Sequence, residues 1–214
     1  VGSEMCIRDR PCLDTHYYET FNSSHVQLID ISDHEIETIT PHGLRVRGEE
    51  FTFDALVFAT GFDAMTGSLL KMNITGVADY TLNEAWANGP RTYLGLGIPS
   101  FPNLFTVTGP GSPSVLTNMI MAIEQHVEWI RDCLVSMRDN GYAAIEAKPD
   151  AADAWVSHVN SIADQTLYPS CNSWYLGANI PGKTRVFMPL IGFPDYAERC
   201  EEVASNNYEG FTLV

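Results

Sequence analysis

Apolar side chains recur at three- and four-residue steps between residues 116 and 137, and this is the clearest periodic pattern in the chain. The stripe consists of Leu116, Met119, Ile120, Ile123, Val127, Ile130, Leu134 and Met137. Such spacing predicts an amphipathic helix with one buried face. Ser112 is a good N-cap and Pro113 has the φ angle wanted at a first helical position. The helix is therefore expected to begin there and to end near Asn140-Gly141.

A short apolar run over residues 101–108 precedes this helix and predicts a buried strand. The sequence Gly109-Pro110-Gly111-Ser112-Pro113 lies between the two elements. A strand, a glycine-rich turn and a helix in this order would direct backbone N–H groups and a helix dipole at a ligand, such as a phosphate or an electron-rich ring carbonyl. A strand-turn-helix connection that binds no ligand accounts for the same pattern.

The remaining pattern predicts an α/β protein. The run 54–63 is nearly continuously apolar and predicts a central parallel strand buried on both faces, with a ligand site at its end. Smaller elements are also expected. These are strands at 25–30, 35–40, 44–46, 50–53 and 72–74, a helical turn at 82–86, helices at 151–167 and 195–206, and a strand-like end at 208–214.

Composition narrows the range of functions. The 214 residues include 12 Lys and Arg against 27 Asp and Glu, a net charge of −15. This balance disfavours a nucleic acid or an anionic membrane as partner. Neither a membrane-spanning run nor a secretory signal is visible. The five cysteines are scattered without CxxC spacing, which favours a reducing, cytoplasmic setting. The six histidines show no metal-ligand spacing, so no metal site is expected.

The first ten residues, VGSEMCIRDR, do not blend into the sequence that follows. They resemble a translated sequencing-adapter string. We therefore take residues 1–10 as non-native and expect the native sequence to start at about Pro11.

Six runs along the chain carry a resemblance to a known family. They are ATGFDAMTG (59–67), GPRTYLG (89–95), FPNLF (101–105), GPGSPS (109–114), EQHVEW (124–129) and SWYLGANIPGK (173–183). In this order they resemble the C-terminal portion of Baeyer–Villiger monooxygenases, in the phenylacetone and cyclohexanone monooxygenase group. The similarity covers residues 11–214, less than half of such an enzyme. The family's two GxGxxG turns and its FxGxxxHxxxWP signature do not occur in this sequence.

The resemblance implies the C-terminal part of an α/β flavoprotein with two dinucleotide-binding, Rossmann-like domains for FAD and NADPH. Residues 11–60 would end the NADPH-binding domain and cross over to the FAD domain. Residues 61–214 would form the later part of the FAD-binding domain. The implied enzyme uses NADPH, FAD and O2 to insert one oxygen atom into a ketone through a C4a-peroxyflavin, giving an ester or lactone. This chain alone would be inactive, because the N-terminal remainder is missing.

The resemblance also implies site residues by position. Arg10 occupies the column of the arginine that stabilises the peroxide, although it lies inside the adapter-like string and Asp9 replaces an expected lysine. The match of Arg10 is thus either native or accidental. The other implied residues are Ser114, Val115, Leu116 and Thr117 for the substrate, Asn118 and Met119 at the flavin ring, Thr60 and Gly61 in the segment that connects the domains, and Trp174 and Lys183 for NADPH.

Several of these residues fit a purely structural role equally well. Ser114 could cap a helix, Leu116 and Met119 could be core residues, and Trp174 and Lys183 could be a packed aromatic and a solvated charge. The EQHVEW run, with His126, is assigned packing and surface roles. A related N- or S-oxygenating flavin monooxygenase would share much of the pattern. A non-catalytic module that binds a nucleotide or a partner is the alternative from another class.

Overall fold

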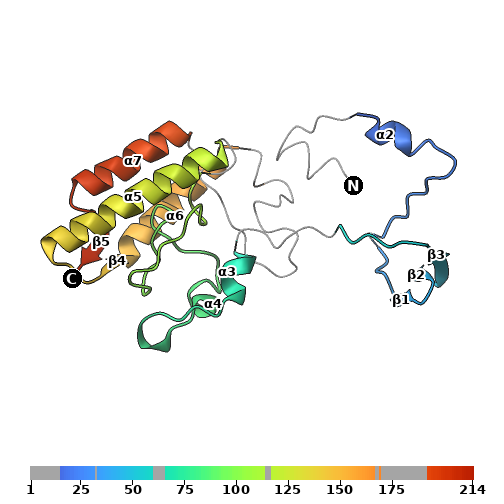
Figure 1. Cartoon of the computed structure of the whole chain (residues 1–214), viewed down its shortest axis with the longest axis horizontal. Coiled ribbons are helices and arrows are strands. Elements are labelled where there is room, and N and C mark those ends of the chain that lie inside the picture. The colour runs from blue at the N-terminus through green and yellow to red at the C-terminus, as the bar shows by residue number, and fades with distance from the viewer. Residues whose placement is uncertain (1–14, 32, 60–65, 114–116, 167–168, 170–191) are drawn as a thin grey trace. The chain divides into compact units, whose positions relative to one another are not determined.

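The computed structural model describes residues 15–31, 33–59, 66–113, 117–166, 169 and 192–214 (Figure 1). The chain divides into two compact units, a smaller one of residues Cys12–Phe62 and a larger one built on Asp63–Val214.

The smaller unit contains a three-stranded antiparallel meander. Its strands are β1 (Thr38–Thr40), β2 (Gly43–Val46) and β3 (Glu49–Thr52), and the helix α2 (Tyr17–Thr20) precedes them. The loop between β2 and β3 consists of Arg47 and Gly48, whose φ angles are 54° and 74°. Positive φ at both loop positions matches the right-handed twist of the flanking strands. The expected strands at 35–40, 44–46 and 50–53 are therefore confirmed within a few residues.

The central parallel strand expected over 54–63 is not formed in its described part. Residues 54–59 belong to no strand, and Val57 and Phe58 are 84% and 66% exposed. A buried parallel strand needs hydrogen-bonded neighbours on both sides, and the described residues of this unit contribute only the meander. Residues 60–63 lie outside the described residues. The strand expected at 25–30 is also wrong, since these residues are described and belong to no strand.

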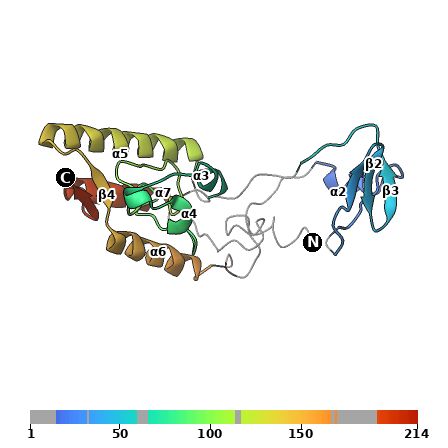
Figure 2. The same cartoon turned by 90° about the horizontal axis from the view of Figure 1, so that it is seen from below.

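Three helices and a small sheet frame the larger unit. The helices are α5 (Met119–Asn140), α6 (Pro149–Ala163) and α7 (Phe193–Ser205), and the antiparallel sheet pairs β4 (Ile145–Ala147) with β5 (Phe211–Leu213). Figure 2 shows α5 and α6 on opposite sides of the unit, and α7 lies beside α5. Short elements precede them, namely α3 (Gly67–Lys71), a 3₁₀ turn (Val77–Asp79) and α4 (Leu82–Ala85).

Local sequence rules account for most helix ends. Gly141 ends α5 in the left-handed conformation with φ 75°, as predicted. Thr81 and Glu84 form a capping box at α4, the helical turn expected at 82–86. The helices expected at 151–167 and 195–206 are present, but each begins two residues earlier. Their starts carry Pro149 and Pro194, which are well suited to the first helical turn.

The strand expected at 101–108 is replaced by an irregular segment. Its one ladder contact is an isolated bridge between Phe105 and Gly97. Asn103 and Thr108 have φ angles of 60° and 51°, which no strand allows. The strand expected at 72–74 is also not formed, because α3 ends at Lys71 and only Thr75 makes a bridge, to Thr81.

The core of the larger unit lies where α5, α6, α7 and the β4–β5 sheet meet. Aromatic side chains dominate it, among them Trp129, Trp155, Tyr196 and Phe211. A smaller cluster under α4 contains Leu82, Trp86, Ile98 and Phe101. None of the helices in the described ranges combines the length and the apolarity that a membrane crossing would need.

The buried face of α5 is not the predicted aliphatic stripe. The buried residues are Ala122, His126, Trp129, Cys133 and Met137. Among the described members of the predicted stripe only Met137 is buried, while Ile120, Ile123, Val127 and Leu134 are 66%, 40%, 51% and 51% exposed. The helix is thus amphipathic in the predicted place, but a different set of side chains faces the core.

Candidate functional site

The glycine-rich sequence forms a buried turn, not the exposed start of a helix. Residues 109–113 are all buried. The side chain and the backbone N–H of Ser112 both donate to the carbonyl oxygen of Gly109, at 2.7 and 3.1 Å. Ser112 therefore closes the turn instead of capping α5. The helix begins at Met119 with Asn118 as its N-cap, so the predicted start at Ser112 and Pro113 is wrong.

Side chains from two other segments hold the turn in place. The hydroxyl of Thr92 donates to the carbonyl oxygen of Pro110 at 2.6 Å, and the indole N–H of Trp155 on α6 donates to that of Gly111 at 2.9 Å. Gly111 has φ +91°, and a Cβ there would meet the Thr92 hydroxyl at 2.8 Å. The turn is thus fitted to its own protein surroundings, which explains the glycine without a ligand.

A buried polar chain joins the turn to α5 and α7. The backbone N–H of Thr108 donates to Nδ1 of His126 at 2.9 Å, so this nitrogen carries no proton. Nε2 of His126 lies 2.9 Å from the Tyr196 hydroxyl, which in turn donates to the carbonyl oxygen of Leu94 at 2.6 Å. Nε2 must therefore be the protonated nitrogen and the donor to Tyr196. Burial lowers the pKa of His126 to about 4 and keeps the ring neutral.

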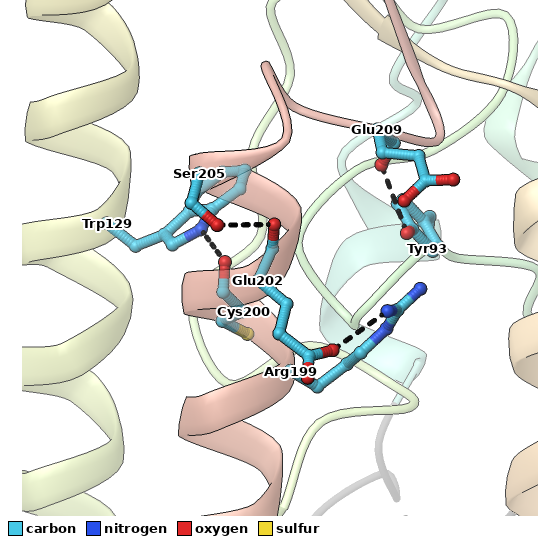
Figure 3. A network of polar contacts seen from close by, with 7 residues as sticks. All are labelled: Tyr93, Trp129, Arg199, Cys200, Glu202, Ser205 and Glu209. Atoms are coloured by element: carbon cyan, nitrogen blue, oxygen red, sulfur yellow. Dashed lines mark hydrogen bonds and ion pairs between the residues drawn. The ribbon is translucent and has the colours of Figure 1, made fainter.

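The orientation of α7 is fixed by a further set of contacts, drawn in Figure 3. The indole N–H of Trp129 on α5 donates to the carbonyl oxygen of Cys200 on α7 at 2.9 Å. Beyond the end of α7, the hydroxyl of Tyr93 donates to the carbonyl oxygen of Glu209 at 3.1 Å. The bond from Trp129 holds α7 against α5, and it therefore helps to keep Tyr196 within reach of His126.

The described residues of the predicted site lie together at the N-terminus of α5. Asn118 is exposed, Thr117 and Met119 are half-buried, and the Asn118 side chain accepts from the N–H of Ile120 at 3.0 Å. The first N–H groups of a helix have no carbonyl partner within it, and they form the positive end of its dipole. An electron-rich or anionic group can be stabilised at such an end.

A cleft lies elsewhere in the larger unit. It is a cleft of about 670 Å³ between α6, α7 and the turn at Gly210, and Tyr93, Trp155 and His158 contribute to its wall. Its charged lining is mixed but mostly acidic. None of Thr117, Asn118 and Met119 lines it. In the described parts of the chain, no group of three or more His, Cys, Asp and Glu residues is arranged to hold a metal ion.

Comparison with known proteins shows which enzymes the chain resembles. No protein-family model matches the chain. A Baeyer–Villiger monooxygenase from Pseudooceanicola batsensis is 40% identical over 201 residues, which are 93% of this chain and 36% of that relative. The closed crystal structure of cyclohexanone monooxygenase matches with a TM-score of 0.90 and 38% identity, over 97% of this chain and 39% of that one. The chain is similar to Baeyer–Villiger monooxygenases over nearly its whole length.

A third Baeyer–Villiger relative extends the comparison. The structure of OTEMO in complex with FAD and NADP matches at a TM-score of 0.87 and 37% identity, over 97% of this chain and 38% of OTEMO. The chain thus spans 36–39% of the length of the three relatives. The structural neighbours are flavin monooxygenases with two dinucleotide-binding domains, which confirms the predicted α/β fold class.

The structure brings together only part of the predicted site. Thr117, Asn118 and Met119 are adjacent at the start of α5. The others lie outside the described residues, and their roles stay predictions. They are Arg10, Thr60, Gly61, Ser114, Val115, Leu116, Trp174 and Lys183.

The residues that hold the Gly109–Pro113 turn are not apparent from the sequence. The sequence predicts a packing or surface role for His126, yet both nitrogens of its buried ring make hydrogen bonds. It predicts no polar role for Tyr196 or Trp155. A signal is available for α5, because His126, Trp129, Cys133 and Met137 follow one another at helical spacing. The stronger aliphatic periodicity of the neighbouring face conceals it.

Proposed function

We propose that this chain is the C-terminal part of an NADPH- and FAD-dependent monooxygenase that inserts one atom of O2 into a ketone, giving an ester or a lactone. The observation that carries the proposal is the match to cyclohexanone monooxygenase, at 38% identity and a TM-score of 0.90 over 97% of the chain. OTEMO, matched over the same share of the chain, is solved with FAD and NADP. Bound FAD would supply the oxygen-transfer chemistry.

We infer that the N-terminus of α5 would face the flavin. In our proposal Asn118 and Met119 present the positive end of the helix to the electron-rich edge of the ring. Asn118 is exposed there, so the position is open to a ligand. Its side chain also caps Ile120, which keeps the helix end ordered. Thr117 would border the ketone site from the same segment.

The remaining assignments rest on position in the sequence. Ser114, Val115 and Leu116 would line the ketone site, and Trp174 and Lys183 would contact NADPH. Thr60 and Gly61 would belong to the connection between the NADPH and FAD domains, and Arg10 would stabilise developing negative charge if it is native. Residues 11–60 and 61–214 would be parts of these two domains, completed by an N-terminal remainder.

A cytoplasmic location is part of the proposal. Cys133 and Cys200, the two cysteines in the described ranges, are both free and buried. Unpaired thiols of this kind are typical of a reducing compartment.

A chimera tests the proposed function. Residues 11–214 would replace the matching 39% of cyclohexanone monooxygenase, and the product would be incubated with NADPH, O2 and either cyclohexanone or phenylacetone. We expect ketone-dependent NADPH oxidation and an ester or lactone identified by mass spectrometry. A thioether assayed in parallel separates the classes, because sulfoxide without any ester product would contradict the proposal. The 214-residue chain alone is the control and should give no product.

A further inference from the structure

Thr108 has an unusual backbone conformation for its residue type. Its φ is 51°, in the left-handed region, although threonine is β-branched. A β-branched residue rarely adopts positive φ, and such strain persists only where the surroundings hold it. Thr108 directly precedes the buried turn Gly109–Pro113, so the contacts that hold it also fix where the turn begins.

One contact that holds Thr108 comes from α5. Its backbone N–H donates to Nδ1 of His126 at 2.9 Å, and the other ring nitrogen of His126 contacts the Tyr196 hydroxyl at 2.9 Å. Tyr196 then donates to the carbonyl oxygen of Leu94 at 2.6 Å. His126 and Tyr196 are completely buried. The direction of the bonds is fixed, since Nδ1 of His126 accepts, Nε2 donates, and the Tyr196 hydroxyl accepts from Nε2 while its own proton goes to Leu94.

The imidazole of His126 lies on α5, the helix whose N-terminus is proposed to face the edge of the flavin ring. His126 follows Met119 by seven positions, which is about two turns or 10 Å along α5. If the ring only filled space, an apolar side chain of similar size would serve as well. It would also avoid the cost of burying two polar nitrogens that each need a hydrogen-bond partner. The matched bonds therefore indicate a role in geometry.

We propose that His126, held in its Nε2–H form by Tyr196, is a positioning residue that fixes Thr108, and through it the Gly109–Pro113 turn, relative to α5. Its importance for catalysis rests on the proposed function, because α5 begins at the edge assigned to the flavin. Loss of the bond to Thr108 lets the turn shift against the helix that carries Asn118 and Met119. Burial keeps the ring neutral near pH 7, as its lowered pKa requires.

Two substitutions separate the two bonds of the ring. In His126→Asn the amide oxygen takes the place of Nδ1 and can still accept from Thr108, while the contact to Tyr196 is lost. In His126→Gln the longer amide takes the place of Nε2 and can still reach Tyr196, while the acceptor for Thr108 is lost. His42→Gln, on an exposed histidine of the smaller unit, is the matched control.

The first readout uses the 214-residue chain and does not need a cofactor. Nitrogen-15 NMR of the imidazole should show Nδ1 unprotonated and Nε2 protonated in the unsubstituted chain. Amide hydrogen exchange at Thr108 should be about tenfold faster in His126→Gln, and nearly unchanged in His126→Asn and His42→Gln. A protonated Nδ1, or equal exchange at Thr108 in the unsubstituted chain and His126→Gln, overturns the proposal. The NMR result decides the matter even where a variant fails to fold.

The second readout uses the chimera with cyclohexanone monooxygenase. His126→Gln should lower kcat for ester formation about tenfold with KM for NADPH unchanged, and His126→Asn should lower it less. A chimera with normal kcat in His126→Gln contradicts the positioning role while leaving the proposed function intact. A chimera that forms no ester contradicts the proposed function, and the NMR and exchange results then decide the positioning role alone.

Discussion

The two long faces of α5 carry the opposite of the usual distribution of side chains. The face toward α7 is buried and includes a histidine, a tryptophan N–H and a thiol. The other face is aliphatic and exposed. On the buried face the ring nitrogens of His126 and the indole N–H of Trp129 have defined partners, so this face fixes which segments lie next to the helix. On the exposed face nothing in the described residues covers the aliphatic side chains. Burial in this helix therefore follows hydrogen-bond complementarity more than hydropathy.

The largest expected difference between the faces is in stability. Trp129→Ala removes a buried indole from the core and should lower the free energy of unfolding by about 3–5 kcal/mol. Leu134→Ala, on the exposed face, is the matched variant and should cost under about 1 kcal/mol. Urea denaturation of the two variants measures both values. Equal losses would mean that the exposed face is covered in solution.

A pH titration tests the polar character of the buried face. The pKa of His126 is lowered from 6.5 to about 4 in the folded chain, because burial disfavours the charged ring. The unfolded chain therefore binds this proton first as the pH falls. The contribution of neutral His126 to the free energy of unfolding is fully present above pH 6.5. It falls by up to about 3 kcal/mol as the pH drops from 6.5 to 4. Urea denaturation across this range should show a smaller loss in His126→Asn, and an equal loss would contradict the assignment.

Thiol labelling is an independent test of the buried contact between α5 and α7. Burial raises the pKa of Cys133 and of Cys200 to about 11, so little of either thiol is ionised at pH 8. Both should be alkylated about 100-fold more slowly than an exposed cysteine, and at the ordinary rate in urea. Peptide mass spectrometry resolves each cysteine separately. Rapid labelling of Cys133 in the folded chain would show that α5 and α7 separate readily.

The smallest expected effect concerns the exposed face. Leu134→Lys should change the free energy of unfolding by no more than about 0.5 kcal/mol, because the side chain is already in water. It should nevertheless reduce self-association, since contiguous exposed apolar surface promotes contact between molecules. Sedimentation velocity at several concentrations measures this. Unchanged association would indicate that another surface is responsible.

The sequence permits prediction of the elements whose signals are local. The end of α5 at Gly141, the capping box of Thr81 and Glu84, and the proline starts of α6 and α7 follow from single residues and their near neighbours. The β2–β3 hairpin is similar, because alternation and a glycine lie within a few positions. The similarity to Baeyer–Villiger monooxygenases could also be inferred from the ordered motifs alone.

The wrong predictions share one physical cause. The conformation of these segments depends on contacts with residues that are distant in the sequence. The 101–108 run resembles a strand, but Asn103 and Thr108 adopt positive φ in contact with residues far along the chain. Ser112 resembles an N-cap, but its hydroxyl closes the turn. The apolar run 54–59 resembles a central strand, but such a strand exists only with its neighbours. In the site, the family resemblance predicts Asn118 and Met119, whereas His126 and Tyr196 are 70 positions apart and no local pattern joins them.

Asn103 has a consequence for how the molecule behaves in concentrated solution. Its backbone N–H donates to the carbonyl oxygen of Ile145 at 2.9 Å, and its side-chain oxygen accepts from the N–H of Ile145 at 3.0 Å. The side-chain nitrogen also donates to the carbonyl oxygen of Ala143 at 3.2 Å. One asparagine thus takes the place of a third strand beside β4. A two-stranded sheet offers its edges to strands of other molecules, and Asn103 occupies the backbone groups of Ile145 on this edge, so fewer groups are left there for such pairing.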